Sequence, residues 1–128
     1  MTKLLLAAGL ALASHPLAAQ DAPAPAEAPL PTLTLEQRSS LRCGVAFGLI
    51  AKGQAEGDAR AAAYPAMEPR GREFFVRTMA GLMDDHDLTR EQANKLAFET
   101  TMTLMNEGLE AREAMMPNCL VLLEASGV

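Results

Sequence analysis

Apolar residues recur at helical spacing through much of the chain, and no stretch shows the period-two alternation of a β-strand. The clearest helical segment runs from about Leu35 to Ala55. One apolar stripe of this helix consists of Leu41, Val45 and Leu49. A neighbouring stripe consists of Cys43, Phe47 and Ile50. Because this apolar face is wide, we expect the helix to lie at the centre of the fold. Gly44 and Gly48, four residues apart, would let a second helix approach it closely.

Further helical segments follow, separated by prolines and glycines. A short piece begins at Asp58 and stops before Tyr64-Pro65, and a longer helix is predicted from about Arg70 to Asp85. The inward residues of that helix are Phe75, Met79, and Leu82 or Met83. The pattern therefore predicts an all-α fold, a small bundle of four to five helices.

The longest predicted helix opens at Thr89 and ends near Arg112. Its predicted core stripe is Phe98, Met102, Met105 and Leu109. Pro117 is predicted to force a corner and to start a final short helix that includes Cys119 to Ala125, with Gly127 ending it.

Two helix starts share the pattern L-T-x-E-Q. Thr34 and Thr89 can each accept a hydrogen bond from the backbone of the residue three positions on, and Gln37 and Gln92 can return one. These capping boxes fix the expected starts of the first and the longest helix.

The N-terminus has the layout of a secretory signal. Lys3 supplies a positive charge, Leu4 to Ala13 is an uncharged apolar run, and small residues close the segment at Ala19. The run is too short to span a membrane, for which about 20 apolar residues are needed. We therefore predict a cleavable signal peptide at 1–19, a Pro/Ala-rich disordered tether at 20–31 and a single helical domain at 32–128. The mature protein would be soluble, in the periplasm or outside the cell, with no transmembrane segment.

Export changes the expected state of the two cysteines, Cys43 and Cys119. In an oxidising compartment they are predicted to form one intramolecular disulfide. Two buried free thiols, or a bridge to another molecule, are the alternatives. No C-x-x-C motif is present, so a thioredoxin-like redox role has no support.

Charge excludes one class of partner. Lys3 leaves with the signal, so 10 of the 11 basic residues and all 16 acidic residues remain, a net charge of −6. An acidic chain of this kind argues against nucleic acid as a partner. Another periplasmic protein is the partner class that stays open.

The first candidate site is a metal site on one helix face. Met79, Met83 and His86 are spaced i, i+4, i+7, and thioether and imidazole ligands suit Cu(I). The alternative is that the two methionines belong to the core and that His86 lies at a solvated helix end. Copper is thus the one cofactor that the sequence leaves open.

The second candidate site is an anion- or ligand-binding corner. Arg70, Arg72 and Arg77 gather near a predicted helix N-terminus, with Tyr64 close by. The alternative is a proline-bounded corner whose arginines pair with Glu68, Glu73 and other surface carboxylates.

No catalytic motif is present: G-x-S-x-G, H-E-x-x-H and Gly-rich phosphate loops are all missing. We therefore predict a non-enzymatic, exported binding or stress-related module that works through an apolar groove or surface. The abundance of Met supports this, because Met surfaces re-pack around varied partners. A copper-binding protein using the Met/Met/His face is the alternative.

Several short motifs resemble an uncharacterised family of small exported, two-cysteine helical bacterial proteins. They are Arg42-Cys43-Gly44, Tyr64-Pro65, the run Arg70–Phe75 and the run Met116–Leu120. The resemblance covers most of the mature chain and implies no activity or ligand. In size and cysteine count the chain is also similar to small periplasmic acid-stress chaperones, a likeness of architecture alone.

Overall fold

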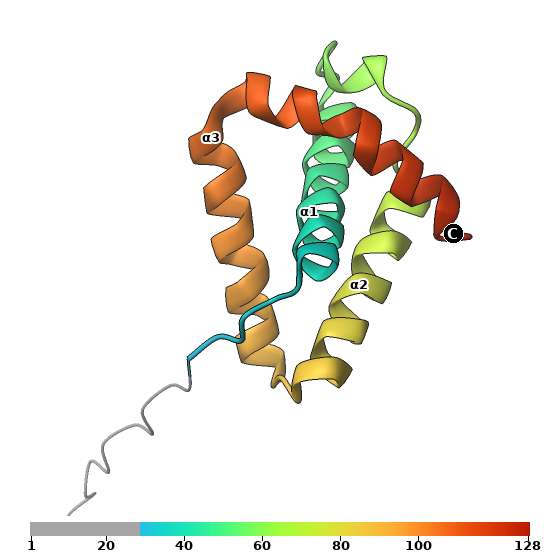
Figure 1. The fold of residues 1–128 in the computed structure, drawn as a ribbon. Coiled ribbons are helices and arrows are strands. Elements are labelled where there is room, and N and C mark those ends of the chain that lie inside the picture. The colour runs from blue at the N-terminus through green and yellow to red at the C-terminus, as the bar shows by residue number, and fades with distance from the viewer. Residues whose placement is uncertain (1–28) are drawn as a thin grey trace, which may run out of the picture.

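Three α-helices and one 3₁₀ turn make up the secondary structure of residues 29–128, the part of the chain that this computed structural model describes. In chain order they are α1 (Leu35–Glu56), η1 (Ala61–Ala63), α2 (Arg70–His86) and α3 (Arg90–Ala125). Helix α1 lies between α2 and the first part of α3, and the second part of α3 crosses α1 toward the start of α2 (Figure 1). The prediction of an all-α fold is confirmed. The predicted signal peptide and most of the tether lie outside the described residues.

Both predicted capping boxes are present. The side chain of Thr34 accepts a hydrogen bond from the Gln37 backbone at 3.1 Å, and the Gln37 side chain accepts one from the Thr34 backbone at 3.0 Å. Thr89 and Gln92 repeat the arrangement at the start of α3. Because each box satisfies two otherwise unpaired backbone N–H groups, the starts of α1 and α3 are set by local sequence.

Helix α3 is bent at Gly108, where the backbone takes φ 87° and ψ 176°. The bend divides α3 into a first limb (90–107) and a second limb (109–125). The predicted corner at Pro117 is wrong, since this residue lies inside the second limb. The loss of one N–H donor at Pro117 is tolerated there, whereas the backbone of Gly108 leaves the helical region altogether. The prediction of four to five helices is also wrong, because the C-terminal segment belongs to α3 and the piece after Asp58 is only a 3₁₀ turn.

Substituting Gly108 by alanine is expected to lower the free energy of unfolding by about 1–3 kcal/mol. A Cβ at this φ and ψ is strained, although nothing lies within 4 Å of the position it would occupy. Denaturant unfolding followed by circular dichroism measures the change. Gly48→Ala is the matched control, because Gly48 lies inside α1 and also faces open space. The control should be neutral or slightly stabilising, and an equal loss in both variants would contradict the strain at the bend.

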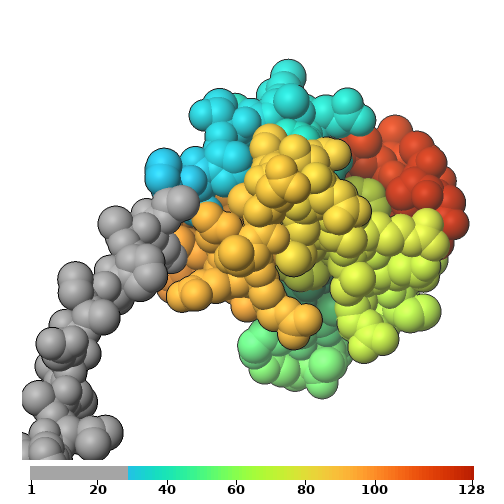
Figure 2. Space-filling model, turned by 90° about the horizontal axis from the view of Figure 1, so that it is seen from below, coloured from blue at the N-terminus to red at the C-terminus, as the bar shows by residue number. Residues whose placement is uncertain are grey.

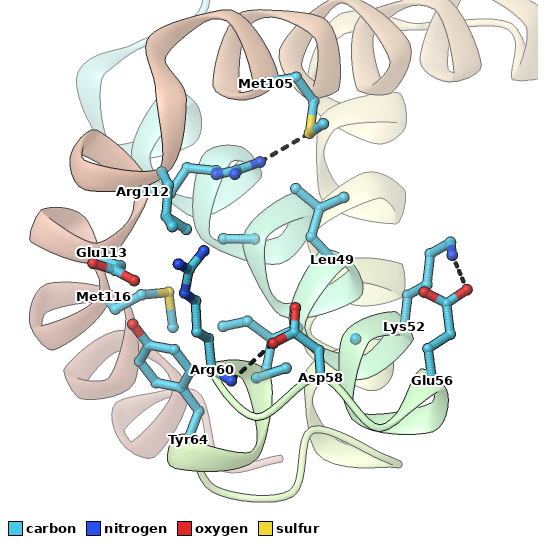
Figure 3. Close-up of a pocket in the computed structure, with 15 residues that line it drawn as sticks. Leu49, Lys52, Glu56, Asp58, Arg60, Tyr64, Met105, Arg112, Glu113 and Met116 are labelled. Carbon is cyan, nitrogen blue, oxygen red and sulfur yellow. Dashed lines mark hydrogen bonds and ion pairs between the residues drawn. The ribbon is translucent and has the colours of Figure 1, made fainter.

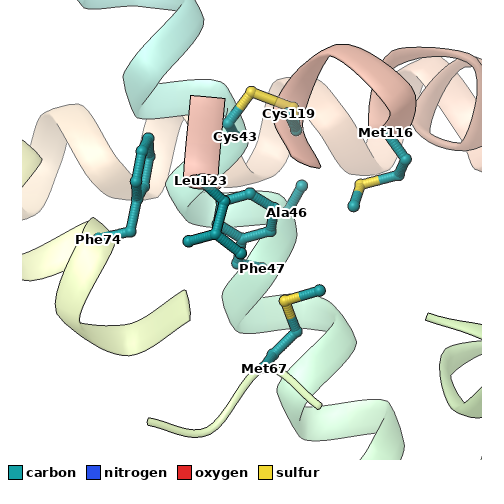
Figure 4. Close-up of a cluster of buried hydrophobic side chains, with 8 residues drawn as sticks. All are labelled: Cys43, Ala46, Phe47, Met67, Phe74, Met116, Cys119 and Leu123. Atoms are coloured by element: carbon teal, nitrogen blue, oxygen red, sulfur yellow. A yellow bond between two sulfur atoms is a disulfide. The ribbon is translucent and has the colours of Figure 1, made fainter. Parts of the chain in front are cut away.

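The first of two hydrophobic clusters lies where the second limb of α3 crosses α1 (Figure 4). Phe47 is fully buried, and its ring meets that of Phe74 edge to face with centroids 5.3 Å apart. Cys43 and Cys119 form a disulfide with an S–S distance of 2.04 Å. The predicted disulfide is therefore confirmed, and it fixes the second limb to α1.

The second cluster joins α1, the C-terminal part of α2 and the first limb of α3. Its buried members are Leu41, Val45, Leu82, Leu88, Leu96 and Leu104. Leu30, which falls in the predicted tether, and Leu33 pack against this cluster from the segment before α1. Gly44 allows α2 to approach, since a Cβ there would lie 3.2 Å from the Phe75 Cα. Gly48 faces open space, so the close approach predicted there is wrong.

The predicted core stripe of the long helix is exposed. Phe98 is 65% exposed, Met102 45%, Met105 50% and Leu109 38%. The first limb instead buries Ala93, Leu96 and Leu104 against the other helices. At 100° per residue these two sets lie on nearly opposite faces of the limb, so both satisfy the helical period and only one can face the core. The predicted core set is the exposed one, so this prediction is wrong. We refer to Phe98, Met102, Met105 and Leu109 as the α3 stripe.

Candidate binding groove

A groove of about 440 Å³ lies between α1, η1 and α3 (Figure 3). Ala46, Leu49 and Ile50 of α1 form its apolar floor. Met105, Leu109 and Met116 of α3 line the facing side, and Tyr64 closes one end. The volume falls within the range of small-molecule sites, which are mostly apolar with a few polar groups.

One wall of the groove is held by the side chain of Gln54. Its amide Nε2 donates to the backbone carbonyl oxygens of Ala61 at 3.1 Å, Tyr64 at 3.2 Å and Pro65 at 2.9 Å. Its Oε1 accepts from the backbone N–H of Met67 at 3.1 Å. The amide thus satisfies backbone groups of a segment with little regular structure, and it holds η1 and the following turn against the end of α1.

The other side of the groove is held by an ion pair beside the bend in α3. Arg42 Nη1 and Nη2 donate to the two carboxylate oxygens of Glu107 at 2.9 and 2.6 Å. This hydrogen bonding lowers the pKa of Glu107 and raises that of Arg42. Because Glu107 directly precedes Gly108, the pair fastens the bend to α1 and fixes the position of Met105 and Leu109 relative to the floor.

Charged side chains line the rim. Lys52 and Glu56 form an ion pair with one another, and Asp58 Oδ1 accepts a hydrogen bond from the backbone N–H of Arg60 at 2.8 Å. Figure 3 shows the guanidinium groups of Arg60 and Arg112 directed into the same space above the floor. Within residues 29–128 neither forms an ion pair with a carboxylate. Arg112 Nη1 lies 2.8 Å from Met105 Sδ, a weak acceptor.

The groove opens onto the α3 stripe. Met105 and Leu109 belong to both, and Met102 and Phe98 continue the apolar surface toward the start of α3. The exposed apolar surface is therefore continuous with a hollow that has an apolar floor. Such continuity distinguishes a binding surface from the isolated exposed apolar residues found on most proteins.

The arginines of the predicted corner are engaged in separate ion pairs. Arg70 donates to Glu124 at 2.9 Å and to the Val128 carbonyl oxygen at 2.8 Å. Arg72 pairs with Glu68, and Arg77 with Glu73. In Figure 2 the end of α3, in red, lies against the start of α2, in yellow-green, where Arg70 makes this link. The hydrogen bond from Arg70 lowers the pKa of Glu124. The fourth residue of this predicted corner, Tyr64, lines the groove instead.

The predicted copper ligands occupy one face of α2 that turns toward the second cluster. Met79 and Met83 are half-buried and pack against that cluster. His86 Nε2 lies 3.1 Å from Gln37 Oε1. In the described part of the chain, no group of three or more His, Cys, Asp or Glu side chains could hold a metal ion. The packing of Met79 and Met83 on the second cluster agrees with the alternative, in which the two methionines belong to the core.

Of the residues that line the groove, only Tyr64 was named as a site residue from the sequence. The residues missed include Arg60 and Arg112, which line the groove, and Gln54, which supports its wall. Gln54 is one polar residue among several in the last turns of α1, and nothing local signals its contacts with the segment that follows. Arg60 and Arg112 are 52 positions apart, and only the bend at Gly108 and the turn around η1 bring them together.

Comparison with protein-family models, with curated proteins and with solved structures found no match. The resemblance to a family of small exported two-cysteine proteins therefore stays a prediction. Among residues 29–128, no helix has the length and apolar character needed to cross a membrane.

Proposed function

We propose that the chain is an exported, non-enzymatic binding module that takes up an apolar ligand in the groove between α1 and α3. The observation that carries the proposal is the α3 stripe, four large apolar side chains exposed in a line that runs into the groove. Leaving such a surface in water is unfavourable by about 25 cal/mol per Å², and ligand binding would relieve that cost.

Two features support the other parts of the proposal. Met102 and Met105 give the exposed surface flexible, polarisable side chains that adjust to a ligand's shape. The Cys43–Cys119 disulfide suits the oxidising compartment to which the predicted signal peptide would send the chain. The groove supports the binding half of the sequence-based prediction, and no observation bears on a stress-related role.

A neutral apolar dye such as Nile red should bind the exported, processed chain saturably. In the double variant Met105→Gln/Leu109→Gln, its Kd should rise at least about tenfold, because two apolar contacts are lost and about 1.4 kcal/mol corresponds to a factor of ten. Dye fluorescence measures the binding.

The matched control is Val76→Gln/Val121→Gln, which removes two exposed apolar side chains that do not line the groove. This control should leave the Kd of the dye unchanged. Dye uptake without saturation, or an equal loss in both double variants, would refute a defined apolar site.

A further inference from the structure

We propose that the groove selects a single-chain anionic amphiphile, a fatty acid, whose carboxylate lies between the guanidinium groups of Arg60 and Arg112. The inference rests on the proposed function, since it names the chemical class of ligand for the same site. The acyl chain would lie on the floor formed by Ala46, Leu49 and Ile50.

Arg60 and Arg112 differ from other arginines of the chain in their partners. Elsewhere on the molecule Arg42, Arg70 and Arg77 each donate to a carboxylate of this chain. Arg60 and Arg112 have no such partner among the described residues, yet both point into the hollow (Figure 3). A guanidinium fork matches the two oxygens of a carboxylate, and two forks that converge over an apolar floor supply the complementary charge.

The apolar surface of the groove is elongated by the α3 stripe. The volume of about 440 Å³ suits a small ligand. Beyond the groove, the α3 stripe from Met105 to Phe98 adds about 10 Å of exposed apolar surface at 1.5 Å per residue. A linear hydrocarbon chain can follow such a path. A bilayer surface cannot, because the floor is recessed between α1, η1 and α3.

Two carboxylates of the protein, those of Glu113 and Asp58, also line the groove and bear on the binding of an anionic ligand. Glu113 lines the groove on the α3 side and forms no ion pair within the described chain. Asp58 also lines the groove, but its Oδ1 accepts from the backbone N–H of Arg60. A bound carboxylate would experience repulsion from Glu113, so Glu113→Gln should strengthen fatty-acid binding a few-fold.

The experiment compares laurate with dodecanol, its neutral counterpart, as competitors of Nile red for the exported, processed chain. Laurate should compete at least about tenfold better than dodecanol. In Arg60→Gln/Arg112→Gln the advantage of laurate should disappear, whereas competition by dodecanol should stay unchanged. The exposed Arg60→Gln alone should give a smaller loss, which keeps the test valid if the double variant is unstable. Arg90→Gln, at the start of α3 and away from the groove, is the matched control and should behave as wild type.

Three results would overturn the inference. Laurate and dodecanol could compete equally, the arginine variants could retain the full preference for laurate, or phosphatidylglycerol vesicles could displace the dye while free laurate does not. Each of these leaves dye binding intact. Failure of the proposed function is distinct, because the dye itself would then not bind saturably and neither competitor could be measured.

Discussion

Replacing both cysteines by alanine is expected to lower the free energy of unfolding by about 4 kcal/mol. The Cys43–Cys119 bond joins residues 76 positions apart, and the chain-entropy model assigns a loop of that size about 4.5 kcal/mol. The bond also fixes the second limb of α3, which Gly108 separates from the first limb. Without it, that limb keeps the packing of Met116, Leu123 and their neighbours on the first cluster, and the hydrogen bonds from Arg70 near its end.

Thermal unfolding of the oxidised chain with and without reductant measures the effect. The melting temperature of the wild type should fall strongly when the bond is reduced, while Cys43→Ala/Cys119→Ala should melt at a low temperature under both conditions. An unchanged melting temperature after complete reduction, checked by the two-dalton gain in mass, would refute a structural role for the bond.

Phe47→Ala is expected to cost about 3–5 kcal/mol, the range for removing a buried phenylalanine side chain. Phe47 is 0% exposed and contacts α2 through Phe74. A Cβ at Gly71 would lie 2.9 Å from the Phe47 Cβ, so the start of α2 packs closely against the Phe47 side chain. The cavity left by truncation would lie where α1, α2 and the second limb meet.

The matched variant is Phe98→Ala, the same chemical change at a residue that is 65% exposed. It should alter the free energy of unfolding by no more than about 0.5 kcal/mol, the usual range for surface substitutions. It should instead weaken binding of a ligand that extends onto the α3 stripe. Denaturant titrations of both variants give the comparison. Similar losses of stability in the two would show that the stripe is buried against the fold.

Local signals predicted the helix starts correctly. The capping boxes at Thr34 and Thr89 place the beginnings of α1 and α3, and the observed α1 and α2 end within one residue of their expected ends. The bond between Cys43 and Cys119 followed from their number and from the expected compartment. The helix boundaries depend on residues close in sequence. The disulfide has one possible intramolecular pairing, because the chain has two cysteines.

Features that depend on packing were not predictable in the same way. The first limb of α3 carries apolar residues on two nearly opposite faces, and the sequence period does not say which face Leu96 or Met102 belongs to. Gly108 lies inside the predicted long helix, yet the backbone leaves the helical region there and the helix changes direction. The groove results from that redirection, so its lining could not be assembled before the bend was known.

The wall that Gln54 supports has a consequence for how the groove can change. The Gln54 amide binds only main-chain atoms of Ala61, Tyr64, Pro65 and Met67, so it places no demand on the identity of most side chains in that segment. Substitutions at the exposed positions of this segment, Ala62, Ala63, Pro65 and Ala66, can therefore be accepted while the fold is kept. Ala61 and Met67 are buried and Tyr64 packs on the first cluster, so burial, and not the Gln54 amide, decides which positions of the segment can diversify.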